Sequence, residues 1–96
     1  MYLRITRSSG DPSRMDEAMA LNQEILAAVH RQPGFQSAYP GADRASGRAV
    51  AVSIWETQEQ AAMPRDALGL GDLVSRLEAV GLQLEPPDVY EITGQV

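Results

Sequence analysis

Four side chains with the chemistry to hold a small molecule alternate along two strand-like segments of the sequence. Tyr2 and Arg4 lie in the first segment, Ser53 and Trp55 lie in the second, and one residue separates the members of each pair. An aromatic ring can stack on a flat ligand, while a guanidinium or a hydroxyl donates hydrogen bonds to oxygen atoms. Because residues i and i+2 of a strand share a face, we predict that these four side chains line one binding site.

Two further residues extend this candidate ligand site. Tyr39 joins it if its strand turns that side chain inward, but weak alternation leaves the phase of the segment open. Asn22 lies within the apolar stripe of a helix, where its amide either contacts a ligand or bonds to a backbone carbonyl or water. His30, at the edge of that stripe, either abstracts a proton or caps the helix end. Trp55 itself either stacks on a ligand or seals the end of a barrel against a partner.

The sequence lacks the residues for several common kinds of catalytic and metal-binding site. The chain contains no cysteine and one histidine, which excludes disulfides and thiol catalysis and argues against a metal site made of protein ligands alone. No Ser/His/Asp set, phosphate-binding glycine loop or suitably spaced carboxylate pair is present. We therefore expect neither a bound metal nor a cofactor.

Charge and length limit the remaining possibilities. The 96 residues include 13 acidic and eight basic side chains, for a net charge of −5, and the basic ones are scattered arginines. A nucleic-acid partner is therefore not expected. No apolar run is long enough to span a bilayer, and no secretion signal opens the chain, so we expect a cytoplasmic protein without membrane contact. The length predicts a single domain over residues 1–96.

Hydrophobic periodicity predicts six main elements in the order strand, helix, strand, strand, helix, strand. Alternating segments predict strands, and apolar residues at helical spacing predict helices, the first opened by Asp11-Pro12 and ended by Pro33-Gly34. Thr57 and Gln60 form a capping-box pattern ahead of a short helical piece that Pro64 ends. The predicted ranges are strands 2–7, 35–39, 48–55 and 88–93, and helices 15–29 and 70–80.

This order predicts an α+β domain of ferredoxin-like βαββαβ topology. Its four-stranded antiparallel sheet would carry both helices on one face. The aliphatic positions of the first and third strands share one phase, which we predict faces the helices: Leu3, Ile5, Val50, Val52 and Ile54. The opposite phase mixes small, polar and aromatic side chains, as expected for the wall of a cavity. We predict that two copies stack these second faces as a homodimer and enclose a cavity between their sheets.

The sequence resembles the antibiotic biosynthesis monooxygenase superfamily of dimeric α/β barrels. The similar segments are Pro33-Gly34-Phe35, the turn from Asp43 to Gly47, the run from Ala49 to Thr57 into the helix with Glu59 and Ala61, and Tyr90-Glu91-Ile92. The resemblance implies a small-molecule cavity. It also implies one of several activities, which include cofactor-free oxidation of aromatic phenols and anthrones.

Single positions refine what the resemblance implies. Trp55 matches the tryptophan that borders the pocket in this superfamily, whereas Ala51 stands where the oxygenase members have an asparagine. The haem-degrading members carry a histidine where this chain has Met63, Pro64 and Arg65, so haem degradation is not expected.

Two functions follow as hypotheses. The first is a cofactor-independent monooxygenase acting on a planar aromatic or phenolic substrate, with Trp55 and Tyr2 holding it and Arg4 or Ser53 stabilising a phenolate or enolate. The second is a non-catalytic dimeric small-molecule binding or interaction module, which the shortage of titratable groups favours slightly.

Overall fold

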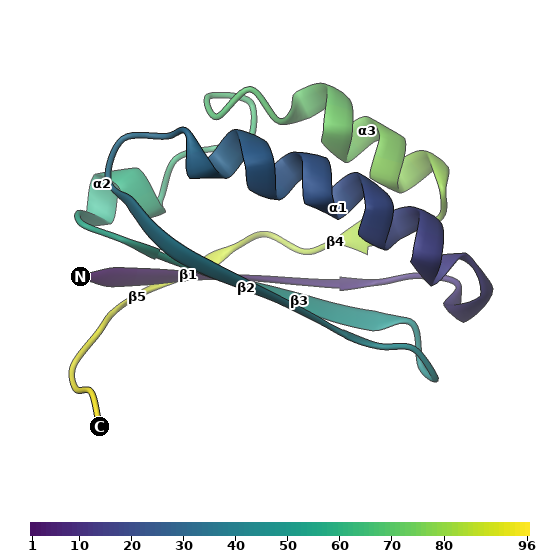
Figure 1. The fold of residues 1–96 in the computed structure, drawn as a ribbon, viewed down its shortest axis with the longest axis horizontal. Coiled ribbons are helices and arrows are strands. Elements are labelled where there is room, and N and C mark those ends of the chain that lie inside the picture. Colours follow the sequence, from purple (N-terminus) through teal and green to yellow (C-terminus); the bar gives the residue numbers. More distant parts are fainter.

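The computed structural model describes residues 1–96, folded as a sheet with helices on one side (Figure 1). In chain order, the elements are β1 (Tyr2–Ser9), a short 3-10 turn η1 (Pro12–Arg14), α1 (Met15–His30), β2 (Phe35–Asp43), β3 (Arg48–Trp55), α2 (Gln58–Ala61), α3 (Gly71–Ala79), β4 (Gln83–Leu84) and β5 (Asp88–Glu91). The predicted α+β, ferredoxin-like architecture is confirmed.

The sheet is antiparallel, with β3 between β2 and β1, and both β4 and β5 paired with the free edge of β1. One strand was predicted at that edge, and two short ones are found there. Pro86 and Pro87 lie between them, and proline has no N–H to donate to a strand ladder. The edge position of the predicted fourth strand is therefore shared by β4 and β5.

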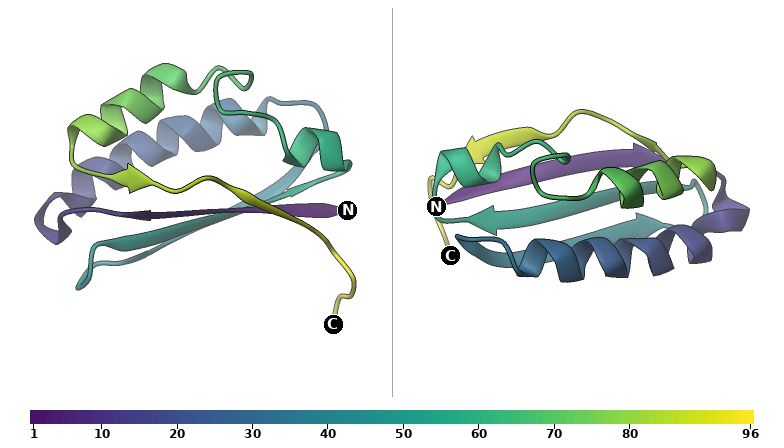
Figure 2. Two further views of the ribbon diagram at one scale, coloured as in Figure 1. Left: turned by 180° about the vertical axis from the view of Figure 1, so that it is seen from behind. Right: turned by 90° about the horizontal axis from the view of Figure 1, so that it is seen from above.

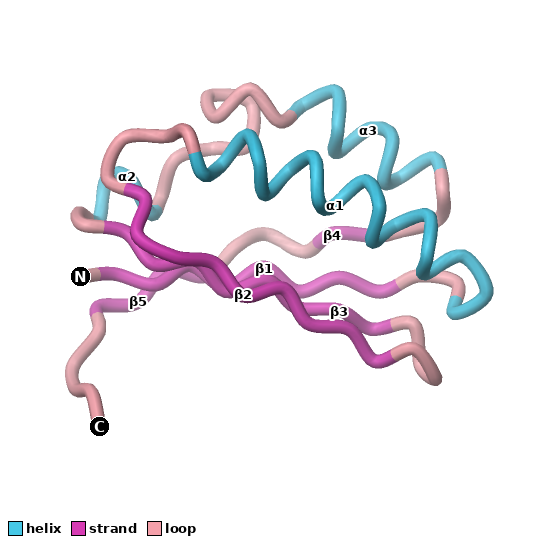
Figure 3. Tube along the Cα trace, in the orientation of Figure 1, coloured by secondary structure: helices cyan, strands magenta, loops and turns pink.

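Both long helices lie on the same face of the sheet. Seen edge-on, the strands form the lower layer and the helices the upper layer (Figure 3). Seen from above, α1 and α3 run side by side along the strands (Figure 2). The other face carries no helix, and the C-terminal residues leave the domain on that side (Figure 1).

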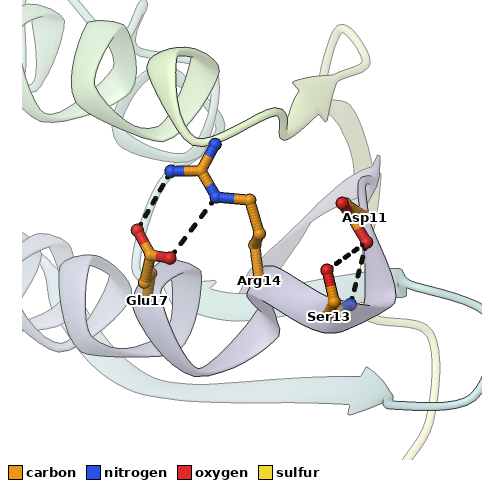
Figure 4. Close-up of polar contacts among 4 residues, drawn as sticks. All are labelled: Asp11, Ser13, Arg14 and Glu17. Atoms are coloured by element: carbon orange, nitrogen blue, oxygen red, sulfur yellow. Dashed lines mark hydrogen bonds and ion pairs between the residues drawn. The ribbon is translucent and has the colours of Figure 1, made fainter.

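The start of α1 is fixed by two local side-chain contacts (Figure 4). The Asp11 carboxylate accepts hydrogen bonds from the backbone N–H of Ser13, at 2.9 Å, and from its hydroxyl, at 2.7 Å. These bonds lower the pKa of Asp11. One turn on, the Arg14 guanidinium donates two hydrogen bonds to Glu17 and lowers the pKa of that carboxyl. The predicted Asp11-Pro12 start therefore forms η1, and α1 follows it directly.

The predicted capping box at Thr57 is confirmed. The Thr57 hydroxyl accepts from the Gln60 N–H, and the Gln60 side-chain oxygen accepts from the Thr57 N–H. Gly34, whose φ is +80°, lies directly against the Gln60 side-chain amide. The turn before β2 and the start of α2 are therefore packed together, and only glycine fits at position 34.

The prediction for β2 was too short. The strand continues through Pro40 and Gly41 to Asp43, so the turn of the hairpin covers residues 44–47. Proline is tolerated there because β2 is an edge strand. A register shift between Phe35 and Ser37 turns Phe35 toward the helices and Tyr39 toward the opposite face, which settles the phase that the sequence left open.

The prediction of which sheet face the helices cover was wrong. Trp55 is 1% exposed and packs in a core cluster with Val29, Ala61, Leu68 and Leu70 from the helical layer. The neighbouring strand positions pair in register, Tyr2 with Trp55 and Leu3 with Ile54. The phase of Trp55 and Arg4 therefore faces the helices. The aliphatic phase, which is Leu3, Ile5, Val50, Val52 and Ile54, faces away from them.

The error has a simple physical origin. Alternation along a strand fixes which side chains share a face, but it does not say which face a helix will cover. The helices supply their own bulky core residues, among them Met15 and Leu77, both 2% exposed. Small strand residues such as Ala51 and Ser53 suit the surface beneath them, because they leave room for the helix side chains.

Candidate functional site

A cavity of about 200 Å³ lies inside the subunit, between the sheet and the helices. Residues of the strands line one side of the cavity, and residues of α1, of α3 and of the segment before α3 line the other side. The lining includes Ala38, Ala51, Ile25, Leu26, Leu68, Leu70 and Val74. The cavity was predicted on the other side of the sheet, between two subunits. It lies under the chain's own helices because the Trp55 phase of the strands faces them.

Trp55 and Ser53 form one corner of this cavity. The indole N–H of Trp55 donates a hydrogen bond to the Ser53 hydroxyl oxygen at 2.9 Å. The Trp55 ring meets Phe35 edge to face, with centroids 5.6 Å apart and an interplanar angle of 81°. The indole N–H is therefore already used within the protein. The Ser53 hydroxyl accepts that bond and keeps its own proton available for a further acceptor.

Arg4 is the one charged side chain in the core, at 6% exposed. One of its terminal nitrogens, Nη1, donates to the backbone carbonyls of Ala61, at 3.1 Å, and of Met63. It pairs with no carboxylate. Burial, followed by repulsion from the Arg65 guanidinium, lowers the pKa of Arg4, yet an arginine remains protonated at neutral pH. The cavity wall therefore holds an uncompensated positive charge.

Asn22 lies in the cavity wall contributed by α1. Every side-chain N or O atom sealed from solvent has a hydrogen-bond partner in this structure, whereas the Asn22 amide is only half-buried and has none within the protein. Its carbonyl and NH2 groups can therefore serve a ligand or water as acceptor and donors.

Three other candidates lie elsewhere. Tyr2 packs against the core cluster around Trp55 without lining the cavity. Tyr39 is 66% exposed on the helix-free face, so its predicted place in the site is not supported. His30 is exposed at the end of α1, with its ring 5.5 Å from that of Phe35, outside the cavity.

Arg65 is a cavity residue that sequence reasoning missed. It lines the cavity beside Arg4, and its Nη2 donates to the Glu85 carbonyl at 2.9 Å. The segment after Pro64 has neither helical nor strand periodicity, so nothing in the sequence indicates where its side chains point. Its placement depends on the loop folding back over β1 and the β4–β5 connection.

The cavity offers hydrogen-bond donors and apolar walls rather than acids or bases. Its only ionisable wall residues are Arg4 and Arg65, and no Asp, Glu, His, Lys or Tyr lines it. No group of three His, Cys, Asp or Glu residues is placed to hold a metal ion. No helix has both the length and the apolar composition needed to cross a bilayer. The site can bind and polarise a ligand, and it can stabilise negative charge.

Comparison with known proteins supports the fold. No family model matches the chain, and no curated protein is similar to it in sequence. SnoaB, a cofactor-independent oxygenase from Streptomyces nogalater, has a TM-score of 0.77 and 20% identity, over 99% of this chain and 95% of its own. A protein from Deinococcus radiodurans, described as an antibiotic biosynthesis monooxygenase, has a TM-score of 0.78 and 16% identity, over 100% and 96%.

A third solved structure carries a ligand. It is the ActVA-Orf6 monooxygenase of Streptomyces coelicolor in complex with nanaomycin D, with a TM-score of 0.67 and 22% identity, over 99% of this chain and 88% of its own. The chain therefore has the ferredoxin-like α+β fold of small monooxygenases. More narrowly, its fold is that of the antibiotic biosynthesis monooxygenase family, as its sequence segments predicted.

Proposed function

We propose that the chain binds a small, planar, largely apolar molecule in the cavity beside Trp55 and oxidises it with dioxygen, without a bound metal or flavin. The observation that carries this proposal is a largely apolar cavity whose polar wall side chains, among them Arg4, Ser53 and Asn22, are donors or can act as donors. Two proteins that share the fold are described as a cofactor-independent oxygenase and a monooxygenase, which supports the reaction type.

The wall chemistry suits a substrate that becomes an anion. When the methylene group of an anthrone loses a proton, the negative charge moves to the ring oxygen. One atom of dioxygen then becomes the carbonyl oxygen on that carbon, and the other leaves as water, which contains the remaining hydrogen of that carbon and one proton. Fixed donors at the oxygen lower the cost of this charge in an apolar cavity, and Arg4 and Ser53 are among the residues of its wall. Water must accept the first proton, because no wall residue is a base.

Oxygen uptake tests this activity directly. With an anthrone substrate, we expect Arg4→Gln to lower kcat/KM by about 10²-fold, the scale expected for losing one charge-stabilising donor. The control is Arg76→Gln, which removes the same charge from a surface ion pair with Glu24 and is expected to leave uptake unchanged. If wild type and both variants consume oxygen at the rate of buffer alone, the chain is not this enzyme.

A non-catalytic carrier is the second candidate. The absence of a base from the wall and the presence of Ala51 in place of the asparagine of oxygenase relatives both favour it. A carrier would show quenching of Trp55 fluorescence by the ligand without product formation, since Trp55 is the only tryptophan. Turnover of the same ligand would favour the enzyme.

We also propose that the chain acts as a homodimer, joined through the helix-free sheet face. An apolar sheet face is stable when another layer covers it. Aliphatic side chains of β1 and β3 make up the centre of this face, including Ile5, Val52 and Ile54, and Tyr39 and Tyr90 lie exposed toward its edges. A second copy related by a two-fold axis offers a face of the same composition.

A further inference from the structure

The two cavity arginines also line a second, more open hollow outside the first. This outer hollow lies between the loop that follows α2 and the β4–β5 connection, where Met63, Pro64, Ser75, Pro86 and Pro87 contribute to its wall. Arg4 and Arg65 belong to the walls of both hollows. The pair of guanidinium groups therefore stands where the apolar cavity meets the outside.

Neither arginine has a carboxylate partner. Four other arginines form ion pairs with acidic side chains on the surface: Arg7, Arg14, Arg44 and Arg76. Asp66 and Glu78 line the outer hollow but make no ion pair with Arg4 or Arg65. In a chain of net charge −5, the buried Arg4 and the half-buried Arg65 thus place two positive charges side by side, and a buried charge such as that of Arg4 is costly without a partner.

The hydrogen bonds of Arg4 leave one edge of its guanidinium free. Its two backbone acceptors, Ala61 and Met63, are both bound by Nη1. The Nε and Nη2 donors, which together make the fork that fits a carboxylate, have no protein partner, and none of the unpartnered side-chain nitrogens is sealed from solvent. Arg65 uses Nη2 for the Glu85 carbonyl, which leaves its other donors available too.

We propose that the ligand of this cavity is an organic carboxylate, whose carboxyl group binds between Arg4 and Arg65 while its apolar ring lies in the cavity toward Trp55. This inference rests on the proposed function and adds the chemical class of the ligand. The carboxylate neutralises the arginine pair. Because that pair stands where the cavity meets the outer hollow, the bound carboxylate also fixes which end of the molecule enters the cavity. Neutral molecules of the same shape lack the ionic contact with this pair.

Calorimetric titration of the full chain with a matched pair of probes tests the inference. 2-Naphthoate carries the carboxylate, and 2-naphthalenemethanol has the same ring with a neutral group. We expect naphthoate to bind at least tenfold more tightly, since hydrogen bonds to charged groups exceed neutral ones in strength. Arg65→Gln should lower naphthoate affinity about tenfold or more and leave the alcohol unchanged, whereas Arg76→Gln should change neither.

Arg65→Gln is the main variant because Arg65 makes a single hydrogen bond to the protein, and a thermal melt verifies that it folds. Arg4→Lys, which keeps the charge and loses the fork, should also weaken naphthoate binding.

Equal affinities for acid and alcohol, or equal effects of Arg65→Gln and Arg76→Gln, would overturn the carboxylate inference while leaving a ring-binding cavity. Acetate binding as tightly as naphthoate would overturn it as well. No binding of either probe would also overturn the inference, and oxygen uptake with an anthrone would then decide separately whether the proposed function holds.

Discussion

The residues around Trp55 show how a polar atom is accommodated in an apolar core. Its ring is almost completely buried, so its N–H needs an acceptor within the protein, and Ser53, two residues earlier on the same strand face, provides it at 2.9 Å. The same hydroxyl retains a proton to donate into the cavity. One serine therefore both satisfies the indole and presents a donor to a ligand.

Replacing Ser53 by alanine should destabilise the protein by about 1–3 kcal/mol, because it leaves the buried indole N–H without an acceptor. Urea unfolding measures this loss. Ser75→Ala is the control, because its hydroxyl bonds to the Gly71 carbonyl on an exposed part of α3, and less than about 0.5 kcal/mol is expected there. In a Trp55→Phe background the cost of Ser53→Ala should shrink, and an unchanged cost would contradict the role assigned to this hydrogen bond.

At the scale of the elements, the contact between the α1–β2 turn and α2 leaves little freedom for substitution. Gly34 adopts φ +80° and lies against the Gln60 amide, and that amide completes the capping box of a helix only four residues long. A helix this short depends on its cap and its packing. Because the loop that carries Arg65 follows α2, we expect the position of α2 to affect where the Arg65 side chain lies.

Substituting Gly34 by alanine should lower the free energy of unfolding by about 1–3 kcal/mol for the backbone conformation, and further through displacement of the Gln60 side chain. Gly81→Ala is a matched control: its φ is +92°, and a Cβ there would meet nothing within 4 Å, so it reports the backbone cost alone. Denaturant titration compares the two variants. Equal losses would mean that the Gln60 amide moves aside without cost.

At the scale of the whole molecule, the two faces of the sheet differ in what covers them. The face under the helices contains the cavity and the arginine pair, and the face of Ile5, Val52 and Ile54 is the one through which we propose that two copies pair. A change on the second face should therefore alter assembly without altering the cavity.

Sedimentation velocity at micromolar concentration tests the proposed dimer. We expect the wild type to sediment at twice the 10.4 kDa chain mass. Ile54→Asp should sediment as a folded monomer, because it places a charge on the apolar face of β3, belongs to neither core cluster and does not line the cavity. Ala27→Asp, at an exposed position of α1, should remain dimeric. A monomeric wild type would end the proposal.

The sequence alone determined the order of the six main elements, the capping box and which residues of β1 and β3 share a face, because periods of 2 and 3.6 residues and local capping bonds are properties of short segments. It therefore grouped Arg4, Ser53 and Trp55 correctly. Only the tertiary structure decided that this group lies under the helices, that Tyr39 lies on the other face and that Arg65 joins Arg4. A bulge in β2 sets the position of Tyr39, and a loop without periodicity sets that of Arg65. The covered face depends on packing between segments far apart in the chain, which alternation within one strand cannot specify.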